Sequence, residues 1–328
     1  MKKFLLILLL VMAAFPAFSQ VEFEQDNLIF TLYQPEGESP YAVVTGNRLT
    51  EETSVVIPSK VNKDGVDYDV TSIGYRAFSW RAITSIDIPN SVTSIGEEAF
   101  FRCEYLLSLI LPNSITSIGS DAFSCCTTLE SIYIPDSVES IGEFAFSECT
   151  SLSFLNIPNS VTSINKFTFN LCTSLESIYI PDSVRSIEYG AFSGCISLKS
   201  VYMSNSVTLI ENEAFGKCNN ISEINYNTTE PIEAYQPIFS NETYANATLN
   251  VAVGGLAKAK TTSPWMYFKN IREIEFSGVD SPVADSGSDA PVEIYNMNGL
   301  YVGDDEKRLA PGMFIVRQGD DVRKISVK

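Results

Sequence analysis

The chain has 328 residues and carries 22 lysine and arginine side chains against 40 aspartate and glutamate, a formal net charge of −18. Nucleic acids and anionic membranes both bind to positive surfaces, so this balance argues against either as a partner. The sequence contains no histidine, which excludes histidine-based triads, histidine general bases and histidine metal ligands.

The first 19 residues have the organisation of a secretory signal peptide. Lys2 and Lys3 precede an apolar run from Phe4 to Ala14, and Ala17 and Ser19 supply the small side chains of a cleavage site. The apolar run is shorter than the roughly 18–20 residues that span a membrane. We therefore predict export and cleavage after residue 19, which leaves a mature chain with a net charge of −20.

Residues 20–55 are predicted to form an N-terminal β cap. Leu28, Phe30 and Leu32 alternate with less apolar residues, and a turn-rich stretch follows at 35–40. Such a cap covers the strand edge that the first coil of a repeat protein would otherwise expose. A hairpin turn is expected at residues 62–65, inside the first, irregular repeat unit.

From about residue 56 to residue 226 the sequence repeats a unit of 23 residues. A fixed period of this size means that each unit buries its apolar face against its neighbours, so the fold class predicted is a mainly β solenoid. Two of the recurring residue types are phenylalanine and cysteine: Phe100, Phe123, Phe146, Phe169, Phe192 and Phe215, and Cys103, Cys126, Cys149, Cys172, Cys195 and Cys218.

Each unit has the spacing of a leucine-rich repeat. Leu129, Ile132 and Ile134 follow the pattern L-x-x-L-x-L, and a proline ends this strand where no ladder hydrogen bond is lost. A second short strand follows. Ala145 and Cys149 are four residues apart, which predicts one helical turn at the close of the coil.

The unit Ile-Pro-x-Ser-Val-x-Ser-Ile-Gly-x-x-Ala-Phe-x-x-Cys-x-x-Leu resembles the BspA-like leucine-rich repeats of bacterial surface proteins. The resemblance covers residues 56–226 and implies adhesion or binding of host proteins. Ser204 in place of the proline, and Glu188 and Glu211 in place of the glycine, depart from the pattern and affect local geometry only.

After residue 226 the period ends. Residues 227–276 are predicted to be a C-terminal cap with one short helix and a final strand, in which Trp265 and Phe268 cover the last coil. Small polar residues at 277–290 are typical of a linker. Residues 291–328 alternate as short strands and resemble the C-terminal sorting domain of type IX secretion substrates, which implies release or attachment at the cell surface.

The cysteine row invites a disulfide interpretation, because exported proteins commonly contain disulfides. Equivalent residues of stacked coils lie roughly 4.8 Å apart with parallel side chains, whereas a disulfide needs its Cβ atoms turned toward each other. We therefore predict reduced, buried cysteines that fill apolar space, with the additional Cys125 facing outward. One cysteine per coil gives no metal-binding pair, and we expect neither a metal nor a cofactor.

The outward positions of the first strand are predicted to line one continuous surface. Exposed aromatic residues beside carboxylates suit recognition of a protein or a glycan, although tyrosine is also common in strands for packing reasons alone. Ile110, Asn156 and Asn225 occupy the same step as three of the tyrosines. The candidate binding residues are Asp87, Glu130, Tyr133, Phe154, Glu176, Tyr179 and Tyr202.

We predict a secreted or cell-surface binding protein, an adhesin that recognises a protein or a glycan, and not an enzyme. One alternative is a structural spacer of the surface layer without a specific ligand. Another is a glycan hydrolase, because Glu130 and Glu176 lie two coils apart, roughly 9.6 Å, a separation near that of an inverting pair. Carboxylates on an open face lack the pocket that raises the pKa of a catalytic acid.

Two tripeptides resemble acceptors of bacterial O-glycosylation. They are Asp136-Ser137-Val138 and Asp182-Ser183-Val184. Turns of this composition also arise for conformational reasons alone.

Overall fold

The computed structural model describes residues 20–50, 53–234 and 237–276, with Phe154 by its backbone alone, together with the backbone of four strands between residues 292 and 327. The predicted signal peptide and linker lie outside the described residues. The four strands are β22 (Val292–Asn296), β23 (Tyr301–Gly303), β24 (Gly312–Gln318) and β25 (Asp321–Val327), which pair antiparallel in the order β23-β22-β24-β25.

The N-terminal cap is an antiparallel meander of β1 (Val21–Gln25), β2 (Leu28–Tyr33) and β3 (Tyr41–Asn47). Asp26 and Asn27 turn the chain between β1 and β2 with φ of 51° and 62°, as a two-residue hairpin requires. The hairpin expected at residues 62–65 joins β5 (Lys60–Lys63) to β6 (Val66–Ile73). Because β6 pairs parallel with β3, the cap leads directly into the first coil.

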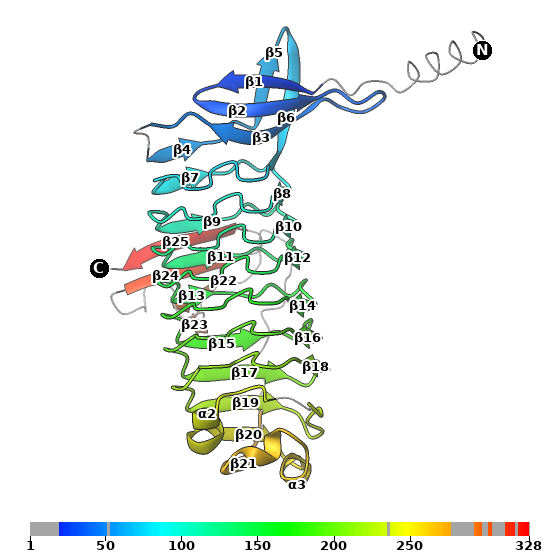
Figure 1. Ribbon diagram of the computed structural model, residues 1–328, viewed down its shortest axis with the longest axis vertical. Helices are drawn as coiled ribbons and strands as arrows, with labels where there is room; N and C mark the ends of the chain where they lie inside the picture. The colour runs from blue at the N-terminus through cyan, green and yellow to red at the C-terminus, as the bar shows by residue number, and fades with distance from the viewer. Residues whose placement is uncertain are drawn as a thin grey trace, which may run out of the picture.

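The coils stack into an elongated solenoid that presents two strand faces (Figure 1). The long-strand face is formed by β4 (Ser54–Val56), β7 (Ser85–Asp87), β9 (Ser108–Ile110), β11 (Ser131–Tyr133), β13 (Phe154–Leu155), β15 (Ser177–Ile180), β17 (Ser200–Ser204), β19 (Glu223–Asn227), β20 (Thr248–Ala252) and β21 (Asn270–Ile274). The short-strand face is formed by β8 (Ser94–Ile95), β10 (Ser117–Ile118), β12 (Ser140–Ile141), β14 (Ser163–Ile164), β16 (Ser186–Ile187) and β18 (Leu209–Ile210). Strands of successive coils pair parallel at equivalent positions, for example Ile178 with Val201.

The third side of each coil, here the turn face, is made of turns and not of the helical turn that the sequence predicted. Amides alternate between two partners: Ala145 N donates to Gly142 O in its own coil at 3.3 Å, whereas Phe146 N donates to Thr168 O of the next coil at 2.9 Å. The positive φ of Phe144, 58°, turns the backbone so that this alternation is possible. A helix would instead keep these hydrogen bonds within one segment.

The recurring phenylalanines form one stack along the core. Ring centroids of consecutive members lie 5.1–5.6 Å apart, and the rings deviate from parallel by 4–17°. Offset stacking of this kind is favourable beyond the burial of area alone. The stack runs from Phe78 through the six phenylalanines of the repeat to Phe239 of the cap.

The glycine of the repeat is explained by close packing. A Cβ added to Gly119 would lie 2.6 Å from Glu97 N of the preceding coil, too close without a backbone shift. Its φ is not positive. Glycine is therefore favoured by the approach of the neighbouring coil.

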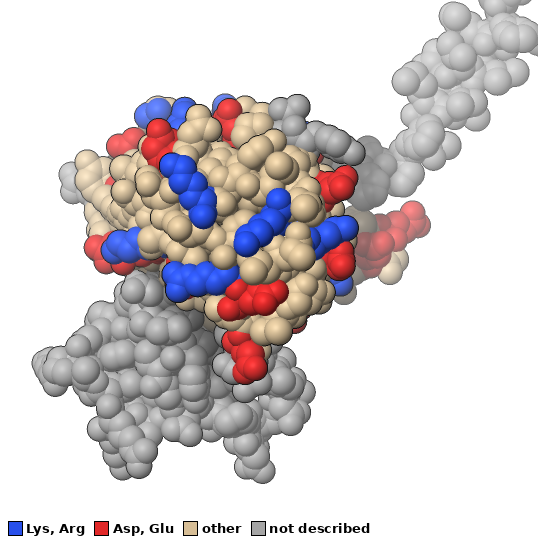
Figure 2. Space-filling view, turned by 90° about the horizontal axis from the view of Figure 1, so that it is seen from below, with Lys and Arg blue, Asp and Glu red and all other residues tan. Residues whose placement is uncertain are grey.

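The C-terminal cap contains α2 (Asn241–Asn246), α3 (Leu256–Ala259), the 3-10 turn η1 (Trp265–Tyr267) and β21; the sequence predicted only one helix here. Ser240 Oγ accepts a hydrogen bond from Thr243 N at 3.2 Å and caps α2. As predicted, Trp265 and Phe268 are buried. The Trp265 ring lies 4.8 Å from Tyr226 and closes the core at the end of the solenoid seen in Figure 2.

We expect Phe146→Ala to lower the free energy of unfolding by about 3–5 kcal/mol, because it removes a fully buried ring from the stack. Phe144 lies two residues away on the turn face and is only half-buried. Phe144→Ala should lower the free energy of unfolding by less than about 1.5 kcal/mol. Urea unfolding followed by circular dichroism measures both. Equal losses in the two variants would contradict a core that depends on the stack.

Candidate binding faces of the solenoid

The long-strand face carries the residues that the sequence singled out. Parallel register places Tyr179 beside Tyr202, Tyr133 beside Ile110, and Phe154 beside Ser131. Tyr133 is half-buried, whereas Asp87, Glu130, Glu176, Tyr179 and Tyr202 are exposed. The register of the strands therefore places these residues on one face; the side chain of Phe154 lies outside the described part of the chain.

Asn225 does not belong to this exposed set, contrary to the expectation from its position. It is only 5% exposed. Its Oδ1 accepts a hydrogen bond from Asn250 Nδ2 at 2.8 Å, and the same Nδ2 donates to Glu223 Oε1 at 2.7 Å. Asn225 lies between Tyr202 and Asn250 in the register of the strands, and its amide hydrogen bond joins β19 to β20.

Charge and burial vary along the face. Glu176 pairs with Lys199 of the next coil at 3.0 Å, and both side chains remain about half exposed. Burial, with the nearby Glu223 carboxylate, raises the pKa of Tyr202, so this phenol stays a hydrogen-bond donor well above neutral pH. Tyrosine hydroxyls and carboxylates that remain partly exposed to solvent are suited to the polar rim of a binding surface.

The carboxylates of the hydrolase alternative, Glu130 and Glu176, lie on strands of coils that are two apart, with Ser153 at the equivalent position between them. Both are exposed, and Glu176 is held by Lys199. An inverting mechanism needs one carboxyl group kept protonated by its surroundings. Neither side chain is buried: Glu130 is exposed to solvent, and Glu176 is exposed and forms a salt bridge with Lys199.

An apolar group at the N-terminal half of the same face was not predicted from the sequence. Tyr105, Leu107 and Ile110, all in one coil, are 59%, 51% and 50% exposed. The positions equivalent to Tyr105 hold alanine, serine, threonine or asparagine, and those equivalent to Leu107 hold threonine, glutamate, serine or lysine. Comparing every column of the repeat, and not only the tyrosine column, would have revealed this group. Val56, on β4, is also exposed.

The turn face has two aromatic groups of its own. Phe144 stacks on Phe167 at 4.9 Å, and Phe167 meets Tyr189 edge-on at 5.0 Å. Further toward the N-terminus, the Arg102 guanidinium lies 4.5 Å from the ring of Trp80, which is 64% exposed. Phe144, Phe167 and Trp80 all have positive φ, a conformation unusual for large side chains.

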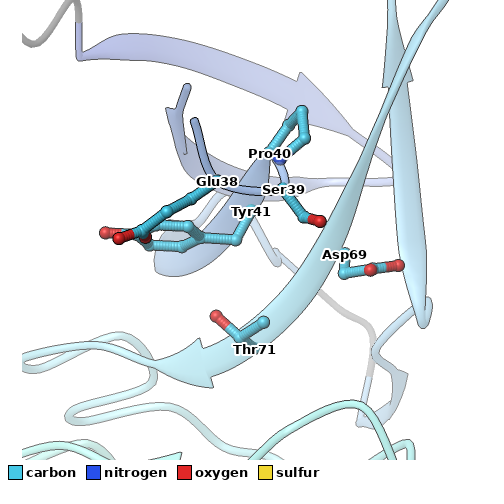
Figure 3. A pocket seen from close by; sticks show the side chains of 6 residues that line it. All are labelled: Glu38, Ser39, Pro40, Tyr41, Asp69 and Thr71. Carbon is cyan, nitrogen blue, oxygen red and sulfur yellow. The ribbon is translucent and has the colours of Figure 1, made fainter. Parts of the chain in front are cut away.

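A hollow open to solvent lies in the N-terminal cap and is lined by Glu38, Ser39, Pro40, Tyr41, Asp69 and Thr71 (Figure 3). Tyr41 is stacked on Tyr33 with centroids 4.8 Å apart. The Asp69 carboxylate pairs with Lys60 at 3.3 Å. The hollow is formed by the start of β3 and by β6, and none of the residues predicted to bind a partner lines it.

The tripeptides that resemble glycosylation acceptors do not present free hydroxyls. Ser137 Oγ donates to Ile115 O of the preceding coil at 2.7 Å. Ser183 Oγ is buried. Both serines are therefore better explained by turn packing within the folded chain.

Comparison with known families and structures agrees with this geometry. The sequence model of the BspA type leucine rich repeat region matches six copies, over residues 71–172 and 145–253. Together these ranges exceed half of the chain. The chain belongs to the BspA-type leucine-rich repeat family.

Several solved structures are similar to this chain. A leucine-rich repeat protein of T. pallidum is 28% identical, with a TM-score of 0.53, over 61% of this chain and 91% of that chain. A leucine-rich repeat protein from Bacteroides capillosus is 32% identical, with a TM-score of 0.37, over 41% and 96%. A leucine-rich cell surface protein from Faecalibacterium prausnitzii is 21% identical, with a TM-score of 0.40, over 80% and 96%. A search of curated proteins gave no match.

The described part of the chain shows neither a cluster of metal ligands nor a membrane-spanning helix. Within residues 20–50, 53–234 and 237–276, no three histidine, cysteine, aspartate or glutamate side chains gather closely enough to hold a metal ion. The same part of this BspA-type chain contains no helix that is long and apolar enough to cross a membrane.

The cysteines of the BspA-type unit act as buried hydrogen-bond donors. Each Sγ of the repeat donates to the carbonyl of the phenylalanine one coil earlier, for example Cys149 to Phe123 O at 3.1 Å and Cys126 to Phe100 O at 3.2 Å. The six cysteines of the repeat are buried, as predicted, and all seven are free in the structure. Cys125 was expected to face outward and is instead buried at 7% exposure, with its Sγ 3.9 Å from Ser124 Oγ.

We expect these thiols to be unreactive in the folded chain. Burial raises the pKa of Cys103 to about 12 and raises the pKa of Cys126 and Cys149 well above the usual value. Since the thiolate is the reactive form, alkylation at pH 8 should be slow until urea unfolds the chain, and seven labels should then be added without prior reduction. Fewer labels in unreduced, unfolded protein would reveal disulfides.

Proposed function

We propose that this chain is an exported binding protein of the bacterial surface, an adhesin whose long-strand face contacts a partner protein or glycan. The observation that carries the proposal is the exposed group Tyr105, Leu107 and Ile110. Folding does not require these residues, because other coils with the same backbone hold small or polar residues at the first two positions and aspartate, asparagine or tyrosine at the third. Contiguous exposed apolar residues on a soluble surface are typical of interaction sites.

The tyrosines and acids of the C-terminal half extend the same surface. Tyr179 and Tyr202 are each 37% exposed and lie in register, beside the Glu176–Lys199 pair. We propose an apolar centre at the coil of residues 104–110 and a more polar extension toward Tyr202. A centre that excludes water with a polar surround is the usual arrangement of a protein-binding site.

Binding without catalysis is the activity that fits this surface. The open face offers Glu130 and Glu176 only as exposed carboxylates, and the sequence has no histidine to serve as a base. Export is supported by the sequence of residues 1–19, and surface attachment or release by residues 291–328.

The first test replaces the apolar group with residues taken from equivalent positions of other coils: Tyr105→Thr, Leu107→Ser and Ile110→Asn in one variant. The mature chain is assayed against a panel of purified host extracellular-matrix proteins and a glycan array. We expect at least about a tenfold loss of affinity for the partner found, which corresponds to about 1.4 kcal/mol.

The matched control removes exposed apolar residues from other faces, again with the chain's own alternatives: Ile196→Thr and Leu209→Ser, which are 51% and 47% exposed in the unchanged protein. It should bind as the unchanged protein does. Equal binding by the long-strand variant and the unchanged protein would refute this site, and no binding to any member of the panel would favour the spacer alternative.

A second variant tests the polar extension. Tyr133→Asn, Tyr179→Asn and Tyr202→Asn introduce the residue that the equivalent position holds at Asn156. We expect a smaller loss, about threefold, because each residue is only partly exposed and contributes at the edge of the contact. Surface plasmon resonance with the same partner gives the value; a loss greater than that of the apolar variant would place the centre at the tyrosines.

A further inference from the structure

The C-terminal end of the solenoid carries a concentration of cations in a strongly acidic chain. Lys258 and Lys260 lie on and just after α3, and Lys269 and Arg272 lie at and on β21, which contacts α3. All four are exposed. Figure 2 views this end directly and shows lysine and arginine side chains spread over its middle, with carboxylates mostly toward its edge. We call these four residues and their surroundings the basic end face.

The cations of the basic end face differ from the others in their partners. Elsewhere in the described chain, cations commonly pair with carboxylates: Lys60 with Asp69, Lys63 with Asp64, Arg76 with Glu98, Lys166 with Glu143 and Lys199 with Glu176. On the end face only Lys258 has such a partner, Glu230 at 3.6 Å. Among the described residues, Lys260 and Lys269 have no ion pair, and Arg272 donates only to Thr248 Oγ1, at 3.2 Å.

The carboxylate nearest in sequence is already occupied. Glu273 Oε1 accepts hydrogen bonds from Gly254 N and Leu256 N, both at 3.0 Å, and so holds the start of α3. It therefore joins β21, which carries Arg272, to the start of α3, which carries Lys258. The chain has many carboxylates, yet Lys260, Lys269 and Arg272 form no salt bridge among the described residues.

Protection of the last strand against edge-to-edge pairing explains part of this arrangement. Charged residues on an edge strand discourage such pairing, and Lys269 and Arg272 flank or occupy the edge strand β21. Lys258 and Lys260 lie outside the strand and have no role in that protection. Protection of the edge strand also does not explain why Tyr267 and Met266 are exposed, at 56% and 47%.

We propose that the basic end face binds an anionic polysaccharide, with sugar carboxylate or sulfate groups on Lys260, Lys269 and Arg272 and a sugar ring on Tyr267. Tyr244 meets Tyr267 edge-on at 5.9 Å and supports its ring in place. Lys269 N donates to Tyr244 O at 3.1 Å, so the chain that carries this cation passes next to the residue that supports the Tyr267 ring. A cation and an exposed aromatic ring in one area match a ligand that has an anionic group on a ring with an apolar face. This site does not depend on the function proposed for the long-strand face.

The exposed apolar residues favour a polysaccharide over an acidic protein. The large ones on this cap are Val253, Met266 and Tyr267, which is few for the apolar centre of a standard protein–protein interface of about 800 Å² per partner. A flexible polyanion needs no such centre, because its affinity comes from charge contacts that salt weakens. The overall negative charge of the chain hides this local positive surface.

The test uses the full mature chain with dextran sulfate and alginate as anionic probes and dextran as the neutral one, at about 50 mM and about 500 mM salt. The end-face variant combines Lys260→Gln, Lys269→Gln and Arg272→Gln. Its matched control combines Lys60→Gln, Lys63→Gln and Lys199→Gln, three cations that are paired with carboxylates. Both variants have the same net charge, and circular dichroism checks that both are folded.

We expect the unchanged chain to bind at least one anionic probe at low salt, the end-face variant to bind it about tenfold more weakly, and the control to stay within about twofold. Binding should be lost at high salt and absent for dextran. Equal losses in both variants, or no binding by the unchanged chain, would overturn the proposal. Equally tight binding of poly-glutamate or of phosphatidylglycerol vesicles would overturn the assignment to a polysaccharide.

Discussion

The structure depends on the hydrogen bonds and ring contacts that join each coil to the next. On the turn face every second amide donates to the following coil, as Phe146 N does to Thr168 O, and the phenylalanine stack repeats the contact in the core every 5.1–5.6 Å. The cysteine thiols reach one coil back, each to a phenylalanine carbonyl. A coil therefore has little stability by itself, and the residues that make these contacts recur with the period of the fold.

This constraint leaves few positions free to vary, and those positions hold the features that stacking does not explain. In one coil Tyr105 and Leu107 expose apolar surface where other coils hold small or polar residues, and the exposed Ile110 lies in the same coil. At the C-terminal end, the cap replaces the repeat and carries cations without carboxylate partners. Two separate surfaces thus differ from the rest of the solenoid, one apolar and one basic, and they suit different classes of partner.

The period predicted the solenoid, the buried phenylalanines and the buried cysteines, because one repeated environment determines them all. It did not predict the helical segment α2, the burial of Cys125 or the absence of a helical turn at Ala145, since these depend on how neighbouring coils approach each other. The burial of Asn225 could not be predicted from its column either, because it depends on Asn250 of the cap, which lies beside it and donates a hydrogen bond to it. For the binding face, the tyrosines were visible in one column of the repeat, whereas Leu107 required a comparison of all columns.

The central claim is that recurring residues stabilise the solenoid and varying residues recognise partners. Replacing residues 104–126 with the sequence of residues 127–149 tests it in one molecule, because the two units have the same length and the same recurring residues. We expect a urea unfolding midpoint close to that of the unchanged chain, and loss of binding to the partner of the long-strand face. A midpoint lowered as far as that of Phe146→Ala, or binding that survives the exchange, would contradict it.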